Sequence, residues 1–127
     1  MILDTDIVVW MLRKHLGALH FADQFGAQER YLSCVSHLEL LGGCRDSQQL
    51  KDLREFIGGW FTEVLPLTPA ASSTAVGIME KFASARRPGV HDVLIAATAL
   101  ERREPVATGN VKHFDFIPGL VVKRFRP

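Results

Sequence analysis

Short apolar runs alternate with longer helical patterns along the chain, and this alternation constrains the fold more than any other feature of the sequence. It is typical of an α/β sheet in which crossover helices connect parallel strands. Strands are predicted at residues 2–4, 31–35, 63–67, 105–108 and 120–123. The predicted fold class is therefore α/β, with a central, mostly parallel sheet of four to five strands and helices on both faces.

Helical patterns and capping residues fill the segments between these strands. Helices are predicted at residues 7–14, 19–27 after a break at Gly17, 36–42, 47–61, 69–86 and 91–103. Ser36 and Glu39 fit a capping box, and Thr68 followed by a proline fits a helix start. The helix over 91–103 is apolar on nearly every side, which predicts burial against the sheet.

The length and composition of the chain are those of a soluble globular protein with one domain. The 127 residues fit a single domain, 1–127, and 47% hydrophobic with 23% charged residues is typical of a soluble globular protein. A net charge of only +1 means that a nucleic-acid partner needs a local basic patch. Cys34 and Cys44 have no zinc or redox spacing, so neither a metal site nor a disulfide is predicted there. No signal peptide or transmembrane stretch is visible, so we expect a cytoplasmic protein without membrane contact.

Four polar residues are predicted to meet at one edge of the sheet. Asp4 ends the first strand, Glu39 lies in the first turn of the helix after the second strand, and Asn110 follows the fourth strand. Asp92 opens the helix that runs antiparallel to the fourth strand, so its amino end returns to the same edge. Ligands bind at this carboxyl edge in open parallel sheets, which makes the four residues a candidate site.

Three carboxylates in one crevice raise one another's pKa unless a cation is present, so we infer a bound divalent metal held by Asp4, Glu39 and Asp92. Oxygen-only ligands favour Mg²⁺ or Mn²⁺. Each acid also has a local structural interpretation, since Asp4 can cap the helix beginning near Thr5, Glu39 can complete a capping box, and Asp92 can favour a helix dipole. Two further acids, Asp6 and Asp115, are interpreted as turn or cap residues outside the site.

Four motifs carry a resemblance to a known family. They lie at residues 2–6, 35–43, 91–99 and 107–114, in order along nearly the whole chain. Their acids are Asp4, Glu39 and Asp92, and Asn110 stands where other members have Asp. In these motifs the chain resembles the PIN-domain ribonucleases and, within them, the VapC-type toxins of bacterial toxin–antitoxin pairs.

The resemblance implies a PIN-like three-layer fold and a Mg²⁺- or Mn²⁺-dependent endoribonuclease that cuts structured RNA such as tRNA or rRNA. It also implies inhibition by a small VapB-type antitoxin, and a homodimer that pairs again in the antitoxin complex. One departure is Gly109, which stands where such toxins often have Arg. Loss of that cation would weaken RNA contact or change the substrate.

Roles follow from the site chemistry. Asp4 and Asp92 are expected to bind the metal, Glu39 to bind through water or orient the nucleophile, and Asn110 to position water or substrate. Supporting hydroxyls are expected from Thr5, Ser36 and Thr108. Five large apolar residues exceed what one small core needs, so part of the set is a candidate dimer or antitoxin surface, although each singly fits the core: Trp10, Met11, Phe56, Trp60 and Phe61.

Two rival functions remain open at this point. A phosphatase with an aspartyl nucleophile would fit Asp4, Thr5 and Asp6 at a strand end, but the chain is short for that fold and offers no convincing lysine partner. A catalytically weak PIN domain that binds RNA or a protein without cutting it is favoured by Gly109 and Asn110. The three intact acids argue against it, and metal-dependent RNA cleavage discriminates the two.

Overall fold

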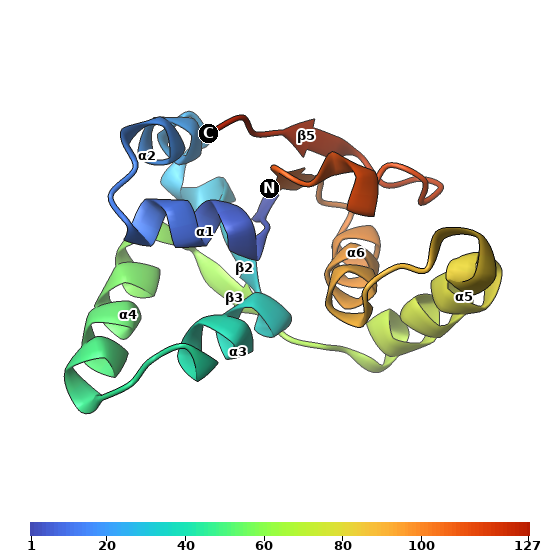
Figure 1. The fold of residues 1–127 in the computed structure, drawn as a ribbon, viewed down its shortest axis with the longest axis horizontal. Coiled ribbons are helices and arrows are strands. Elements are labelled where there is room, and N and C mark those ends of the chain that lie inside the picture. Colours follow the sequence, from blue (N-terminus) through green and yellow to red (C-terminus); the bar gives the residue numbers. More distant parts are fainter.

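The fold is a five-stranded parallel sheet between two groups of helices (Figure 1). A computed structural model describes residues 1–127. Its strands are β1 (Ile2–Leu3), β2 (Tyr31–Ser33), β3 (Glu63–Leu65), β4 (Val106–Thr108) and β5 (Val122–Arg124). Its α-helices are α1 (Thr5–Leu12), α2 (Leu16–Asp23), α3 (Cys34–Gly42), α4 (Ser47–Trp60), α5 (Pro69–Arg86) and α6 (Val90–Arg102). Two short 3₁₀ turns cover Ala27–Glu29 and Val111–His113.

The first strand of the chain lies in the middle of the sheet. The strand order is β3-β2-β1-β4-β5 and every neighbouring pair is parallel, so the α/β fold class is confirmed. Ile2 is in register with Tyr31 on one side and with Val106 on the other. Because all carboxyl ends share one edge, the residues that follow β1, β2 and β4 are brought together.

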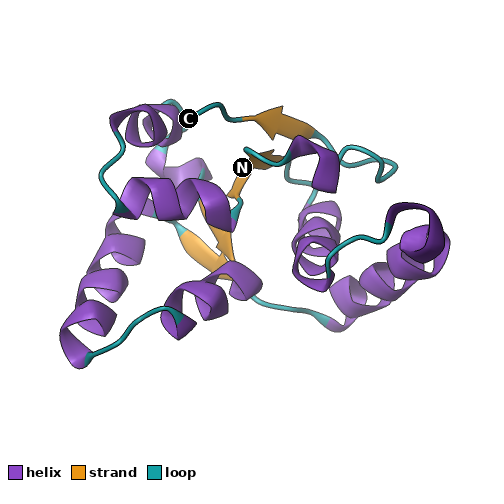
Figure 2. Ribbon diagram, in the orientation of Figure 1, coloured by secondary structure: helices purple, strands orange, loops and turns teal.

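Alternation along the central strands divides the core into two layers. Ile2 and Val106 face a cluster formed with α5 and α6, whereas Leu3 and Ala107 face a second cluster formed with α1, α2 and α4. All four side chains are fully buried, as expected for strands covered on both faces. The two helix groups are separated by the sheet in Figure 2, which gives the three-layer arrangement.

Three predicted helix starts, at residues 7, 19 and 36, lie two or three residues after the observed starts at Thr5, Leu16 and Cys34. Helix α3 is capped by Ser33, whose hydroxyl accepts from the Ser36 N–H at 3.1 Å, so Ser36 lies inside the helix and forms no capping box. Gly17 does not break a helix either. It lies in the first turn of α2, which is capped by the His15 side chain, and a helix tolerates glycine there.

Most other boundaries are close to those predicted, although α2 ends at Asp23 and not at residue 27. Thr68 caps α5 and Pro69 occupies its first turn, as the sequence indicates. Helices α5 and α6 both end at arginines in the left-handed region, Arg87 with φ 46° and Arg103 with φ 54°. The strands predicted at 31–35 and 63–67 each end two residues earlier, at Ser33 and Leu65, and in the first case α3 begins at the next residue, Cys34.

The large apolar residues separate into two groups. Met11 and Phe61 are buried core residues, so they are not part of a free surface. Trp10, Phe56 and Trp60 are half-buried and pack against the cluster around α1, α2 and α4. The two cysteines are free thiols, as predicted. None of the helices combines the length and apolar character that crossing a bilayer requires.

Candidate active site

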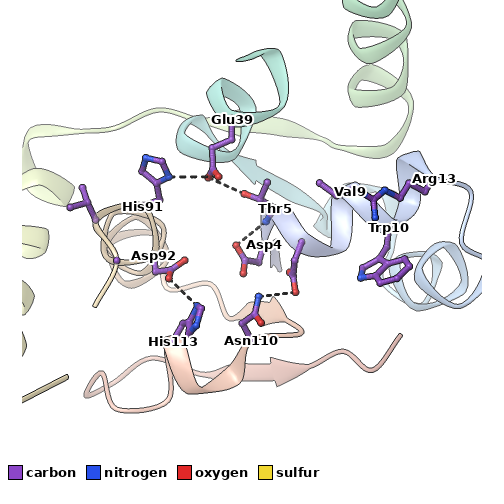
Figure 3. Close-up of a pocket in the computed structure, with 13 residues that line it drawn as sticks. Asp4, Thr5, Val9, Trp10, Arg13, Glu39, His91, Asp92, Asn110 and His113 are labelled. Carbon is purple, nitrogen blue, oxygen red and sulfur yellow. Dashed lines mark hydrogen bonds and ion pairs between the residues drawn. The ribbon is translucent and has the colours of Figure 1, made fainter. Parts of the chain in front are cut away.

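A polar pocket of about 620 Å³ lies at the carboxyl edge of the central strands. Figure 3 shows Asp4, Glu39, Asp92 and Asn110 around it, each arriving from a different segment of the chain. Asp4 follows β1, Glu39 comes from α3, Asp92 from the first turn of α6, and Asn110 from the turn after β4. The structure therefore brings together the four residues that topology predicted at this edge.

Asp4 is held by hydrogen bonds to both carboxylate oxygens. Its Oδ1 accepts from the Thr5 N–H at 2.8 Å, and its Oδ2 accepts from the Thr108 hydroxyl at 2.8 Å. The first bond makes Asp4 the N-cap of α1, so the local interpretation of this acid is also correct. The Thr108 hydroxyl in turn accepts from the Asn110 N–H at 2.9 Å, which connects the ends of β1 and β4.

Glu39 is tied to the same region by the Thr5 hydroxyl. The Thr5 hydroxyl lies 2.7 Å from the Ser36 Oγ and 3.2 Å from the Glu39 Oε1. Ser36 is fully buried and also contacts the Ser33 hydroxyl at 3.2 Å. The three hydroxyls expected around the acids, those of Thr5, Ser36 and Thr108, thus contact Glu39 or Asp4, directly or through Thr5.

Asp6 is a pocket residue that the sequence interpretation left out. Its Oδ1 accepts from the Ile7 N–H at 2.8 Å, and its Oδ2 accepts from the Gly109 N–H at 2.9 Å and the Asn110 Nδ2 at 3.3 Å. Asp6 therefore links α1 to the turn after β4 and lines the pocket. Its two-residue spacing from Asp4 was a usable signal, because the first turn of a helix after a strand stays at the same edge. Asp115 is exposed and lies outside the pocket, as predicted.

Two histidines also face the carboxylates and were not predicted as site residues. The Nδ1 of His113 lies 3.1 Å from the Asp92 Oδ2, and the Nδ1 of His91 lies 3.6 Å from the Glu39 Oε2 (Figure 3). Both imidazoles are more than half exposed, so they lie at the rim of the pocket. Their positions inside the third and fourth motifs were the available signal.

Burial favours the neutral forms of three acids, and neighbouring carboxylates add to this for Asp4 and Asp92. Burial raises the pKa of Asp4 from 3.8 to about 7, with Asp6 and Asp92 adding repulsion, although the Thr108 hydrogen bond acts in the opposite direction. Burial also raises the pKa of Asp6 against hydrogen bonds from Gly109 and Ile7. The pKa of Asp92 is raised by burial as well, and the neighbouring His113 partly offsets this.

The donor set of the pocket fits a hard divalent cation. Four carboxylates and one amide supply oxygen atoms, and the raised pKa values of three acids indicate a site that lacks compensating positive charge. No three acidic, histidine or cysteine side chains converge closely enough to surround a single point. The fit therefore lies in the chemistry of the donors, and Asp4, Asp6 and Asp92 are the residues whose charges a cation would neutralise.

A second concavity of about 900 Å³ adjoins this pocket between α1, α3 and α4. Its apolar walls include Leu12, Leu53 and Phe56. The groove and the pocket share four lining residues, Thr5, Val9, Arg13 and Glu39. A molecule seated in the groove would therefore extend to the rim of the acidic pocket.

Comparison with known proteins gives one family and several similar folds. Residues 1–117 match the family model described as PIN domain. A DNA-bound VapBC complex from Salmonella typhimurium contains a chain with a TM-score of 0.83 and 23% identity, covering 98% of this chain and 97% of that one.

A chain of a toxin–antitoxin complex from Klebsiella pneumoniae has a TM-score of 0.78 and 21% sequence identity, with 94% of both chains covered. A chain of FitAcB from Neisseria gonorrhoeae has a TM-score of 0.76 and 24% sequence identity. The match covers 96% of this chain and 95% of that one. None of the curated proteins matches the chain by sequence.

Proposed function

Because the chain belongs to the PIN-domain family, we propose that it is a Mg²⁺- or Mn²⁺-dependent endoribonuclease that acts as the toxin of a VapBC-type pair. PIN domains are typically nucleases and typically bind Mg²⁺. The observation that carries the proposal is the convergence of four carboxylates and Asn110 in one pocket at the carboxyl edge of the sheet.

The cation that this pocket fits would be held by Asp4 and Asp92, with Asp6 as a further oxygen donor. When bound, such an ion neutralises phosphate charge and lowers the pKa of a bound water. The hydrogen bonds of Asp4 to Thr5 and Thr108 fix its carboxylate before any ligand arrives, which limits the reorganisation that binding requires.

Glu39 and Asn110 are proposed to orient the attacking water and the RNA. Glu39 is about one-third exposed, and its Oε1 is fixed by the Thr5 hydroxyl, so its remaining lone pairs can accept a hydrogen bond from water. The Asn110 side-chain amide donates to Asp6 at 3.3 Å, and Asn110 lines the pocket. Both groups can position polar atoms beside the metal site.

A small antitoxin is the proposed protein partner, and the groove between α1, α3 and α4 is its proposed docking site. The groove has apolar walls between charged residues and shares Thr5, Val9, Arg13 and Glu39 with the pocket, so a chain bound there would block substrate. The similar solved structures are toxin–antitoxin complexes, which supports this partner. A homodimer is proposed as the assembly, and light scattering of the purified protein would measure it.

The decisive experiment is cleavage of total bacterial RNA by the purified protein with Mg²⁺, with Mn²⁺ and with EDTA. We expect discrete metal-dependent fragments from the wild type and their loss in Asp4→Asn and Asp92→Asn. Asp115→Asn is the matched control, because this acid is exposed and outside the pocket. RNA binding without cleavage in both metals would instead favour the rival function, a catalytically weak RNA-binding module.

The toxin role has its own test. Expression of the chain in a bacterial host is expected to arrest growth, and Asp4→Asn is expected to relieve the arrest. Where a short reading frame lies directly beside the gene, its co-expression should also relieve the arrest. Leu12→Glu places a charge in the groove and should restore arrest in the presence of that reading frame while leaving RNA cleavage intact.

A further inference from the structure

One face of α1 leads out of the acidic pocket. Asp6, Val9, Trp10 and Arg13 are spaced i, i+3, i+4 and i+7, so they lie on one side of the helix, and all four line the pocket. In Figure 3, Val9, Trp10 and Arg13 lie on the opposite side of Asp4 from Asp92 and His113. The pocket therefore has an acidic end and an end with an aromatic ring and a guanidinium.

The Trp10 indole is held in a fixed position by its neighbours. Its ring centroid lies 4.8 Å from that of His15, and His15 packs edge-on against Phe125 at 6.5 Å. His15 is itself fixed, because its Nδ1 accepts from the Ala18 N–H at 3.1 Å as the cap of α2. A large, rigid aromatic surface can be contacted with little loss of conformational entropy.

Arg13 supplies the only permanent positive charge among the residues that line the pocket. Its guanidinium carbon lies 5.9 Å from the Trp10 ring centroid, near the outer limit of a cation–π contact. Arg13 is exposed and forms no ion pair with a carboxylate. Arg13 is therefore available to a phosphate, while a planar group can reach only the pocket-lining part of the half-buried Trp10, because His15 and Arg13 contact the ring.

We propose that Trp10 is a stacking platform for one unpaired RNA base next to the cleaved phosphate, and that Arg13 holds the adjoining phosphate. The proposal rests on the proposed function, because it takes RNA as the substrate. The helix places Trp10 about 6 Å along its axis from Asp6, close to one nucleotide step of an extended strand. Single-stranded RNA is commonly recognised by stacking on aromatic rings, combined with cationic contacts to its backbone.

This assignment defines the substrate class more closely. A base inside a duplex cannot stack on a ring that lies beside the pocket, so the cleaved segment must be single-stranded, as in a loop or bulge. Stacking tolerates any base, because every base has a flat face. The platform therefore selects for an unpaired nucleotide rather than for a particular sequence.

The first test uses the fluorescence of Trp10. The chain has two tryptophans, so Trp60→Phe leaves Trp10 as the sole tryptophan. A short single-stranded RNA is added in Ca²⁺, and a gel confirms that the RNA stays intact. We expect quenching of Trp10 fluorescence by this RNA and weaker quenching by the same sequence in a hairpin stem. Absence of quenching at saturating RNA would overturn the platform.

The second test measures RNA affinity in variants whose folding is checked by circular dichroism. Trp10→Leu keeps apolar volume without the flat ring and is expected to weaken binding about tenfold, whereas Trp10→Phe is expected to weaken it about threefold. Removing the stacked base, by an abasic site at that position of the RNA, should weaken binding to the wild type by a similar factor. It should weaken binding to Trp10→Leu very little. Equal sensitivity of both proteins to the abasic site would contradict the proposal.

Arg13 has a matched control in Arg54, since both are exposed arginines associated with helices. Arg13→Gln is expected to reduce the magnitude of the slope of log affinity against log salt concentration by about one, the contribution of one phosphate contact. Arg54→Gln is expected to leave this slope unchanged. An unchanged RNA affinity of Trp10→Leu, together with lost antitoxin binding, would assign the ring to the protein partner and overturn the RNA proposal.

The two proposals fail separately. Trp10-dependent binding of intact RNA with no cleavage in Mg²⁺ or Mn²⁺ would overturn the nuclease function and support the platform. Metal-dependent cleavage together with an RNA affinity that does not depend on Trp10 would support the nuclease function and overturn the stacking platform.

Discussion

The backbone N–H of Gly109 donates to the Asp6 Oδ2 at 2.9 Å, a contact that a side chain at position 109 would disturb. A Cβ atom added to residue 109 would lie 2.6 Å from the same oxygen. Glycine in place of arginine at this position therefore has a second effect besides the loss of a positive charge. It allows the chain to bring the main chain after β4 against an acid of α1.

Gly109→Ala is predicted to displace Asp6 and to destabilise the protein by about 1–3 kcal/mol, the range typical of overpacking. The reason is the 2.6 Å contact, which cannot be relieved without moving the Asp6 carboxylate or the turn. Urea unfolding measures the change in stability. Isothermal titration with Mn²⁺ measures the accompanying loss of metal affinity.

A double-mutant cycle provides the control for this prediction. Asp6→Ala removes the oxygen that a Cβ at residue 109 would meet, so Gly109→Ala should destabilise the Asp6→Ala protein much less than the wild type. Additive effects of the two substitutions would contradict the steric explanation. Gly77→Ala is a useful comparison, because a Cβ there meets nothing within 4 Å.

The stability of the metal-free protein is predicted to fall as the pH rises from about 4 to about 7. Asp4 has a pKa of about 7 in the folded protein and 3.8 in the reference state, because burial disfavours its charged form. The folded state therefore binds the proton more tightly, and this stabilisation is complete below pH 4 and lost as Asp4 ionises. Asp4→Asn removes the ionisation, so its stability relative to the wild type should increase between pH 5 and pH 8.

Metal binding is predicted to reverse this loss. Protons compete with a cation for the carboxylates, so Mn²⁺ should raise the melting temperature of the wild type by several degrees at pH 8 and by much less at pH 5. Differential scanning calorimetry of the wild type and Asp4→Asn at both pH values measures the effect. A rise that is independent of pH, or equal in Asp4→Asn, would rule out Asp4 as a ligand.

His113→Ala is predicted to weaken Mn²⁺ binding by about 10- to 100-fold, the effect of removing a partner that orients a metal ligand. The His113 Nδ1 lies 3.1 Å from the Asp92 Oδ2 and restricts the orientation of that carboxylate. His113→Asn can place an amide nitrogen near the same point and should retain most of the affinity. His91→Ala is the comparison, and its longer 3.6 Å contact to Glu39 predicts a smaller effect. Equal affinities of His113→Ala and the wild type would refute this role.

The sheet could be predicted from sequence because its strands are punctuated by strong local signals. Thr68 and Pro69 mark a helix start by their own chemistry, and the structure agrees. Ser33 and Ser36 show the limit of such signals, since both are N-cap types, and in the structure Ser33 is the cap while the Ser36 hydroxyl contacts Thr5. Local capping preference cannot distinguish two serines three residues apart.

The sheet topology was sufficient to predict those site residues that lie at the ends of strands and helices. Asp4, Asp92 and Asn110 each follow from an element end, and parallel strands place those ends together. Asp6 required knowledge of the turn after β4, because its partners are the Gly109 N–H and the Asn110 amide more than 100 residues away. The rim histidines and the Trp10 face depend on side-chain direction, which neither spacing nor composition specifies.

Arg30→Ala is predicted to destabilise the protein by about 2–4 kcal/mol, because it removes a buried cation that satisfies backbone carbonyls. Arg30 is only 5% exposed and has no carboxylate partner. Its Nε donates to the Trp60 carbonyl at 2.7 Å and its guanidinium donates to the Phe25 carbonyl at 2.6 Å. These carbonyls lie at or just beyond the carboxyl ends of α4 and α2, where helix dipoles favour positive charge.

The planar fork of Arg30 is expected to matter more than its charge. Its guanidinium also stacks on the Trp60 ring at 4.9 Å, a geometry that an ammonium group does not reproduce. Arg30→Lys should therefore recover less than half of the stability lost in Arg30→Ala, and the exposed Arg54→Ala should change stability by less than about 0.5 kcal/mol. Urea unfolding of the three variants measures this. Wild-type stability in Arg30→Lys would show that charge alone holds the ends of α2 and α4 together.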